Sequence, residues 1–152
     1  MILDRYELTA GRNLTTFEFV SEGKRGRIVK IIQFQPMNIE NVYNLAFGDK
    51  NMDTGELDDN VITDNGDSGK VLATVIAALY VFTDRYPDTW IYATGSSNSR
   101  TRLYRMGINK YYDIASSDFD IRGECKNEWE WYEYGKDYQT FAVHKKNSKF
   151  GS

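Results

Sequence analysis

The segment from Ser96 to Lys110 combines the chemical groups that proteins use to bind anions. It contains four basic side chains and no acidic one. It follows a glycine and opens on serine and asparagine residues, so free helix amides and hydroxyl groups would lie beside Arg100. The predicted anion site consists of Gly95, Ser96, Ser97, Asn98, Ser99, Arg100 and Arg102. The alternative is ordinary helix capping by Ser97 or Asn98, with the arginines on a solvated helix face.

The stretch from Asp49 to Asp67 has the opposite charge. Its only base is Lys50, against seven acids. Its first residues resemble the opening of a calcium loop, but Thr54 stands where the sharp turn needs glycine and Asn60 where a bidentate glutamate is required. We therefore expect a solvated hairpin and turn, and the sequence predicts no metal site.

Nucleophilic and metal chemistry have little support in the remaining residues. His144 is the only histidine and Cys125 the only cysteine, so the sequence supports neither a Ser-His-Asp triad nor a zinc site. If Phe141 and Val143 face the core, strand alternation places His144 on the opposite face. We expect a surface histidine and an inert thiol.

The composition is that of a single folded domain. The chain has 152 residues, of which 41% are hydrophobic and 14% aromatic, and only two are proline. The longest apolar run, Val71 to Phe82, is shorter than the roughly 20 residues that a membrane span requires. A start without signal-peptide character and the single cysteine favour the cytoplasm. The net charge of −3 makes nucleic acid an unexpected partner.

Alternating apolar and polar residues predict strands in both halves of the chain. Thr15 to Ser21, Gly26 to Gln35 and Val42 to Gly48 should form an antiparallel meander, and the second of these, apolar on both faces, should be central. A short strand is expected at Leu57 to Thr63. Further strands are predicted at Thr89 to Thr94, Lys110 to Ile114, Trp129 to Tyr134 and Tyr138 to Lys145.

Two helices are expected between these strands. Lys70 to Arg85 is apolar nearly all round, with Asp67 or Ser68 as its cap and Tyr86 as its end. A second, short helix should run to about Met106 and stop at Gly107. The resulting prediction is one α+β domain over residues 1–145, with a mostly antiparallel central sheet around a buried helix, followed by a flexible tail, 146–152.

This order of elements, together with two segments, resembles the GNAT superfamily of N-acetyltransferases. The segment Asp64-Asn65-Gly66-Asp67-Ser68-Gly69-Lys70 is similar to the family's pyrophosphate loop, and Asn98 to Ile108 resembles its Asn...Leu-Tyr...Gly-Phe segment. The resemblance covers about Val42 to Ile114, and the chain also resembles a family of uncharacterised bacterial domains. The resemblance to GNAT implies an acyl coenzyme A, such as acetyl coenzyme A, bound by Gly66, Ser68, Gly69 and Lys70.

The same resemblance implies acyl transfer to an amine, with Tyr104 as the acid and Glu56, Asp58 or Asp59 as the base. The loop departs from the family where Asp64 and Asp67 replace an Arg or Gln and a glycine. Two carboxylates would oppose a doubly charged ligand by roughly 4 kcal/mol each at about 4 Å. We therefore expect a non-catalytic or regulatory binding module without a cofactor, with an anionic small molecule or a protein as partner, and keep acyl-CoA-dependent N-acyl transfer as the alternative.

Overall fold

A computed structural model describes residues 4–58, 61–94 and 98–146. The strands are β1 (Thr9–Ala10), β2 (Thr16–Gly23), β3 (Gly26–Pro36), β4 (Val42–Lys50), β5 (Leu57–Asp58), β6 (Trp90–Thr94), β7 (Phe119–Cys125), β8 (Glu128–Trp131) and β9 (Thr140–Lys145). The helices are α1 (Ser68–Arg85) and α2 (Asn98–Asp118).

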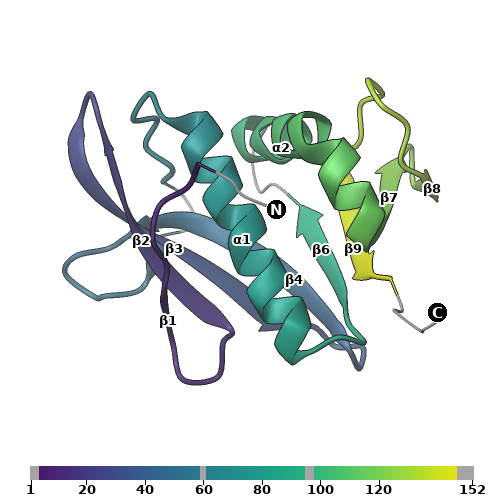
Figure 1. Cartoon of the computed structure of the whole chain (residues 1–152), viewed down its shortest axis with the longest axis horizontal. Coiled ribbons are helices and arrows are strands. Elements are labelled where there is room, and N and C mark those ends of the chain that lie inside the picture. The colour runs from purple at the N-terminus through teal and green to yellow at the C-terminus, as the bar shows by residue number, and fades with distance from the viewer. Residues whose placement is uncertain (1–3, 59–60, 95–97, 147–152) are drawn as a thin grey trace.

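All of these strands belong to one sheet, which both helices cover on the same side (Figure 1). The strand order is β1-β2-β3-β4-β6-β9-β7-β8, with β5 paired to β4. Only β4 and β6 are parallel, and all other described pairs are antiparallel. The predicted α+β domain with a mostly antiparallel sheet is therefore confirmed.

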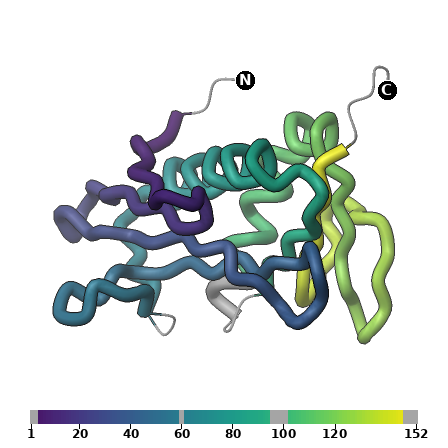
Figure 2. Tube along the Cα trace, turned by 90° about the horizontal axis from the view of Figure 1, so that it is seen from below, coloured from purple at the N-terminus to yellow at the C-terminus, as the bar shows by residue number. Residues whose placement is uncertain are grey.

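The core lies between α1 and the face of the sheet beneath it (Figure 2). Ile32 and Phe34 of β3 point to the helices, and the Phe34 ring stacks on the Phe82 ring of α1 with centroids 4.2 Å apart. Ile31, on the opposite parity, is also buried. The central position predicted for this strand is confirmed, since it pairs with β2 and β4.

Helix α1 has the predicted extent but not the predicted cap. Its buried side includes Val71, Val75 and Phe82, and it ends before Tyr86, whose backbone N–H donates to the Phe82 carbonyl at 2.8 Å. Asp67 occupies the capping position without a hydrogen bond from its side chain to the helix. The prediction of an Asp67 side-chain cap is therefore wrong.

Helix α2 is much longer than predicted. It passes through Gly107 and, across a kink at Tyr111, continues to Asp118, so the strand predicted over Lys110 to Ile114 is wrong. Gly107 does not stop the helix. A methyl group on it would lie 2.9 Å from the Leu72 side chain of α1, so glycine allows the two helices to approach closely. The backbone departs from helical geometry at Tyr111 (φ −109°, ψ 16°).

Smaller differences occur elsewhere. Of the strand expected at Leu57 to Thr63, Leu57–Asp58 is a strand, residues 61–63 are not, and residues 59–60 lie outside the described part. Phe141 and Val143 face the core as expected, and His144 lies on the other face against the Trp90 ring. The predicted tail begins with Lys146, whose N–H donates to Asp118 at 2.9 Å, while residues 147–152 lie outside the described part.

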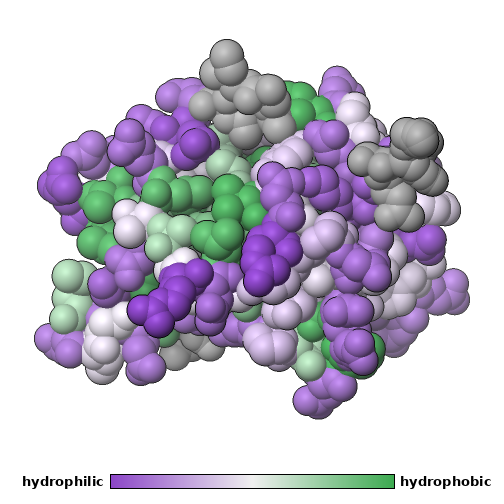
Figure 3. Space-filling model, turned by 60° about the horizontal axis from the view of Figure 1, so that its bottom comes forward, coloured by the Kyte–Doolittle hydropathy of each residue, from purple (hydrophilic) through white to green (hydrophobic). Residues whose placement is uncertain are grey.

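The view in Figure 3 shows a largely hydrophilic surface on which patches of apolar side chains are enclosed by polar ones. Scattered apolar side chains are usual on folded proteins. No helix within residues 4–58, 61–94 and 98–146 is long and apolar enough to cross a membrane.

Candidate anion-binding site at the start of helix α1

Two neighbouring hollows open beside the first turn of α1. The first, of about 340 Å³, lies between residues 62–71, α2 and the floor residues Lys30 and Phe47. The second, of about 400 Å³, is lined by Ser68, Gly69, Leu72, Met106, Asn109, Lys110 and Tyr134. Ser68 and Met106 line both hollows. The structure therefore brings the start of α1 together with the basic segment of α2.

The Asp67 carboxylate is held away from the helix amides by two hydroxyl groups. Tyr6 Oη donates to Asp67 Oδ2 at 2.6 Å, and Ser21 Oγ donates to the same oxygen at 2.5 Å. The carboxylate and burial together raise the pKa of the Tyr6 phenol, burial being the larger cause. No described side chain caps α1, because Ser68 is its first residue and makes no side-chain hydrogen bond to it. The amides of the first turn are therefore open to a ligand.

Asn65 fixes the loop that precedes α1. Its side chain is almost fully buried, accepts from the Arg25 N–H at 2.6 Å and donates to Ser21 Oγ at 3.0 Å and to the Gly26 carbonyl at 2.9 Å. The backbone carbonyl oxygen of Asn65 would lie 2.0 Å from a methyl group on Gly23. The loop is thus tied to the β2–β3 hairpin. The sequence could not show this, because the partners are distant along the chain.

A buried ion pair forms part of the floor of the first hollow. Lys30 Nζ donates to Asp49 Oδ1 at 2.6 Å and to the Thr63 carbonyl at 2.8 Å. The Thr63 hydroxyl donates to Asp49 Oδ2 at 2.5 Å. Sequence reasoning missed Lys30 because it lies within an apolar strand, although a lysine in such a run signals a buried partner.

The two hollows differ in charge. Arg102, Asp64 and Asp67 all line the first hollow, so its one exposed cation faces two carboxylates. No acidic side chain of the described residues lines the second, where Lys110 Nζ lies 2.9 Å from the position that a methyl group on Gly69 would take. Neither Arg102 nor Lys110 makes an ion pair with another described residue. A small anion would be more stable in the second hollow.

The cofactor-binding candidates divide into two groups. Ser68 and Gly69 line the second hollow. Gly66 has a positive φ of 78° and faces the Lys24 side chain, while the Lys70 ammonium lies 4.4 Å from the centroid of the Tyr6 ring, outside both hollows.

The anion-site candidates of the basic segment lie largely outside the described part. Gly95, Ser96 and Ser97 are not described, and for Asn98, Ser99 and Arg100 only the helical backbone is. Arg102 is the one candidate whose side chain is described, and it is exposed on the first hollow. Lys110 belongs to the same basic segment but was not among the predicted site residues.

The catalytic candidates do not meet in these hollows. Tyr104 is buried and lines a separate apolar cavity between the helices and the sheet. Glu56 is exposed in the β4–β5 turn, and Asp58 is opposite Asp49 in the β4–β5 ladder. Asp59 lies outside the described residues. The described part contains no cluster of three or more metal-ligating side chains.

The fold and site thus define a single α+β domain with an open helix start beside basic side chains. The chain belongs to a family of unknown function, DUF6934, whose model matches residues 3–146. The expected resemblance to an uncharacterised domain family is therefore confirmed. The resemblance to N-acetyltransferases is not supported by the family match. Neither a curated protein nor a solved structure matches the chain.

Proposed function

We propose that this protein is a non-catalytic binding module that takes a small anion at the start of α1. The ligand would lie in the second hollow, on the amides of Gly69 and Lys70, with the Lys110 ammonium beside it. The observation that carries the proposal is that, among the described residues, no side chain caps these amides and no acidic side chain lines the hollow in which Lys110 lies against Gly69.

Helix amides and a lysine ammonium together suit a phosphate or carboxylate group. The N-terminal amides donate hydrogen bonds, and the helix dipole favours negative charge at this end. Lys110 is exposed, so it supplies a solvated point charge rather than a buried partner. We therefore expect weak binding that decreases as the salt concentration rises.

The test is a titration of the ¹⁵N-labelled protein with inorganic phosphate at low salt, followed by NMR. Phosphate should shift the amide resonances of Gly69 and Lys70. Lys110→Ala should weaken binding about tenfold, which corresponds to roughly 1.4 kcal/mol, because it removes the ammonium group beside the anion.

Arg12→Ala is the matched control, because it removes one exposed positive charge from the β1–β2 turn and leaves the same net charge as Lys110→Ala. Its affinity should equal that of the unmodified protein. If phosphate affinity fell equally in both variants, the net charge of the protein and not the position of Lys110 would explain the effect. Shifts confined to residues 95–102 would place the site in the basic segment instead, and either result would overturn the proposal.

A second candidate function is N-acyl transfer from acyl coenzyme A. One observation favours it: β4 and β6 pair only from Val42 to Asn44 and from Trp90 to Tyr92. Among the described residues, Leu45 to Gly48 therefore lack a strand partner on that side, and their backbone groups could pair with the amide groups of the coenzyme A arm. Asp64 and Asp67 oppose its phosphates.

Calorimetric titration with acetyl coenzyme A separates the two candidates. A dissociation constant below about 100 μM, equivalent to roughly 5.5 kcal/mol, would favour the transferase. In that case, Tyr104→Phe should lower turnover by about 10²-fold with cofactor affinity nearly unchanged. Phosphate binding without measurable coenzyme A binding would favour the binding module.

A further inference from the structure

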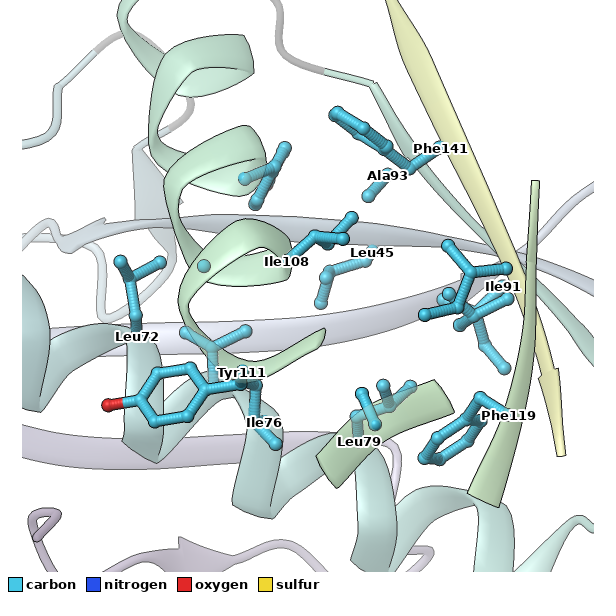
Figure 4. A pocket seen from close by; sticks show the side chains of 16 residues that line it. Leu45, Leu72, Ile76, Leu79, Ile91, Ala93, Ile108, Tyr111, Phe119 and Phe141 are labelled. Atoms are coloured by element: carbon cyan, nitrogen blue, oxygen red, sulfur yellow. The ribbon is translucent and has the colours of Figure 1, made fainter. Parts of the chain in front are cut away.

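A cavity of about 80 Å³ lies between α1, α2 and the C-terminal half of the sheet. Figure 4 shows side chains from both helices and from the strands pointing into it. Among the described residues, its wall includes the tyrosines Tyr104 and Tyr111 but no charged residue, amide side chain, serine or threonine. Among the labelled residues, Leu45, Ile91, Ile108 and Phe141 approach from different elements, and the Tyr111 hydroxyl points away from the group.

The lining decides what the cavity can hold. Water needs two to four polar partners in a buried site, and apolar cavities in proteins stay dry and accept apolar guests. Tyr111 Oη donates to the Gly69 carbonyl at 3.3 Å, so this hydroxyl does not serve the interior. A polar guest would leave its own groups without hydrogen bonds. The lining therefore selects a hydrocarbon.

The size of the cavity limits the length of the guest. A single water occupies roughly 10–15 Å³ on such a scale, so 80 Å³ has room for roughly six atoms of that size. This volume fits a short unbranched chain better than a sterol or a long fatty chain. Side chains of the hydrophobic core line the cavity, so a longer chain would have to displace packed side chains.

One side chain is common to this cavity and to a hollow at the surface. Leu72 lines both the cavity and the second hollow at the start of α1. The Leu72 side chain packs on Gly107, and the absence of a side chain at Gly107 leaves room for it between the two helices. A change in the Leu72 rotamer would open a route from that hollow, and a polar head group would remain in the hollow outside.

We propose that the cavity is a binding site for an alkyl chain of about six carbons, which enters past Leu72. The proposal rests on the cavity and not on the anion site, so a neutral alcohol is a sufficient test ligand. If both proposals hold, the natural ligand is a short-chain amphiphile whose anionic head lies beside Lys110.

The experiment is a titration of methyl-labelled protein with 1-hexanol, followed by NMR and calorimetry. The methyl resonances of Ile91 and Ile108 should shift, and affinity should rise about fourfold per methylene from 1-butanol to 1-hexanol and then level off. The matched probe is 1,6-hexanediol, which has the same chain with a second hydroxyl. It should bind at least tenfold more weakly, because that hydroxyl would be buried without a partner.

Filling the cavity provides the second arm. Ala93→Ile on β6 places a larger side chain in the lining and should weaken 1-hexanol binding at least tenfold, whereas Ala10→Ile, the same change at an exposed position of β1, should not. Ala115→Leu on α2 is the replacement if Ala93→Ile does not fold. Leu72→Ala should move the levelling point to a longer alcohol.

Three results would overturn the alkyl site. They are the absence of methyl shifts at Ile91 and Ile108, equal binding of 1,6-hexanediol, and unchanged binding in both filled variants. The phosphate titration is independent of all three. Loss of phosphate binding in Lys110→Ala with retained 1-hexanol binding would support both proposals, and the converse results identify which one has failed.

Discussion

At the scale of the residue, Lys30 shows how a charge can be kept inside the core. Its side chain is 1% exposed and that of Asp49 is 12% exposed. Thr63 completes the arrangement by donating its N–H and hydroxyl to Asp49 and accepting from Lys30 through its carbonyl. Removing one partner would leave the other charge buried without compensation. The resulting loss in the free energy of unfolding is larger than the net contribution of the intact pair.

We expect Lys30→Met to lower the free energy of unfolding by about 3–5 kcal/mol, because it leaves the Asp49 carboxylate buried without its counter-charge. Urea denaturation at neutral pH measures this effect. Arg27→Met is the control, since Arg27 pairs with Glu22 at the surface, where such pairs contribute about 0–1 kcal/mol. A loss below 1 kcal/mol for Lys30→Met would contradict the interpretation of the pair.

At the scale of the element, two glycines determine how closely a helix or a strand packs on its neighbour. Gly107 lets α2 lie against Leu72, and Gly123 lets β7 lie under the Tyr138 ring. A methyl group on Gly123 would be 2.4 Å from Tyr138 Cδ1 and 2.5 Å from Cγ. The Tyr138 ring is held by two hydrogen bonds, to Glu130 at 2.8 Å and from the Glu133 N–H at 3.0 Å.

Gly123→Ala should therefore destabilise the protein by about 1–3 kcal/mol or more, although glycine normally weakens a strand. Thermal and urea unfolding measure the loss. Gly107→Ala is the comparison: the one close approach of its methyl group, 2.9 Å, is to a terminal methyl carbon of Leu72, and alanine favours the helix by about 1 kcal/mol. Similar losses at both positions would show that the Tyr138 contact is not decisive.

At the scale of the whole molecule, buried tyrosines make stability depend on alkaline pH. Burial is the main cause that raises the pKa of Tyr6, Tyr80, Tyr132 and Tyr138, and for Tyr138 burial together with the hydrogen bond to the Glu130 carboxylate raises the pKa to about 12. An unfolded tyrosine ionises near 10. Above that pH the unfolded chain loses protons that the folded chain keeps, so the free energy of unfolding falls.

We expect stability to be independent of tyrosine ionisation below about pH 10 and to fall from there towards pH 12. Tyr138 alone should contribute a fall of about 3 kcal/mol, since one pKa unit equals 1.36 kcal/mol. Urea denaturation at successive pH values measures the slope. Tyr138→Phe should make it shallower, whereas Tyr134→Phe, at a position 73% exposed, should leave it unchanged. Equal slopes in all three proteins would contradict the prediction.

Local patterns in the sequence were sufficient for the α+β class, the N-terminal meander and the extent of α1. Strand alternation and the apolar surface of α1 are properties of neighbouring residues, so they can be found without knowing the fold. The start of α1 at Ser68 and Gly69, and the basic character of the segment that includes Arg102, were also evident. These features supplied two of the residues that line the second hollow.

The tertiary structure decided what those local patterns could not. Gly107 is a helix stop by local preference, but contact with Leu72 outweighs that preference and α2 continues. Asp67 is a cap by local preference, but Tyr6 and Ser21 bind its carboxylate. In both cases the competing partner is distant along the chain, and the local preference that it opposes is worth only about 1 kcal/mol. Only the fold therefore leaves the helix amides open beside Lys110.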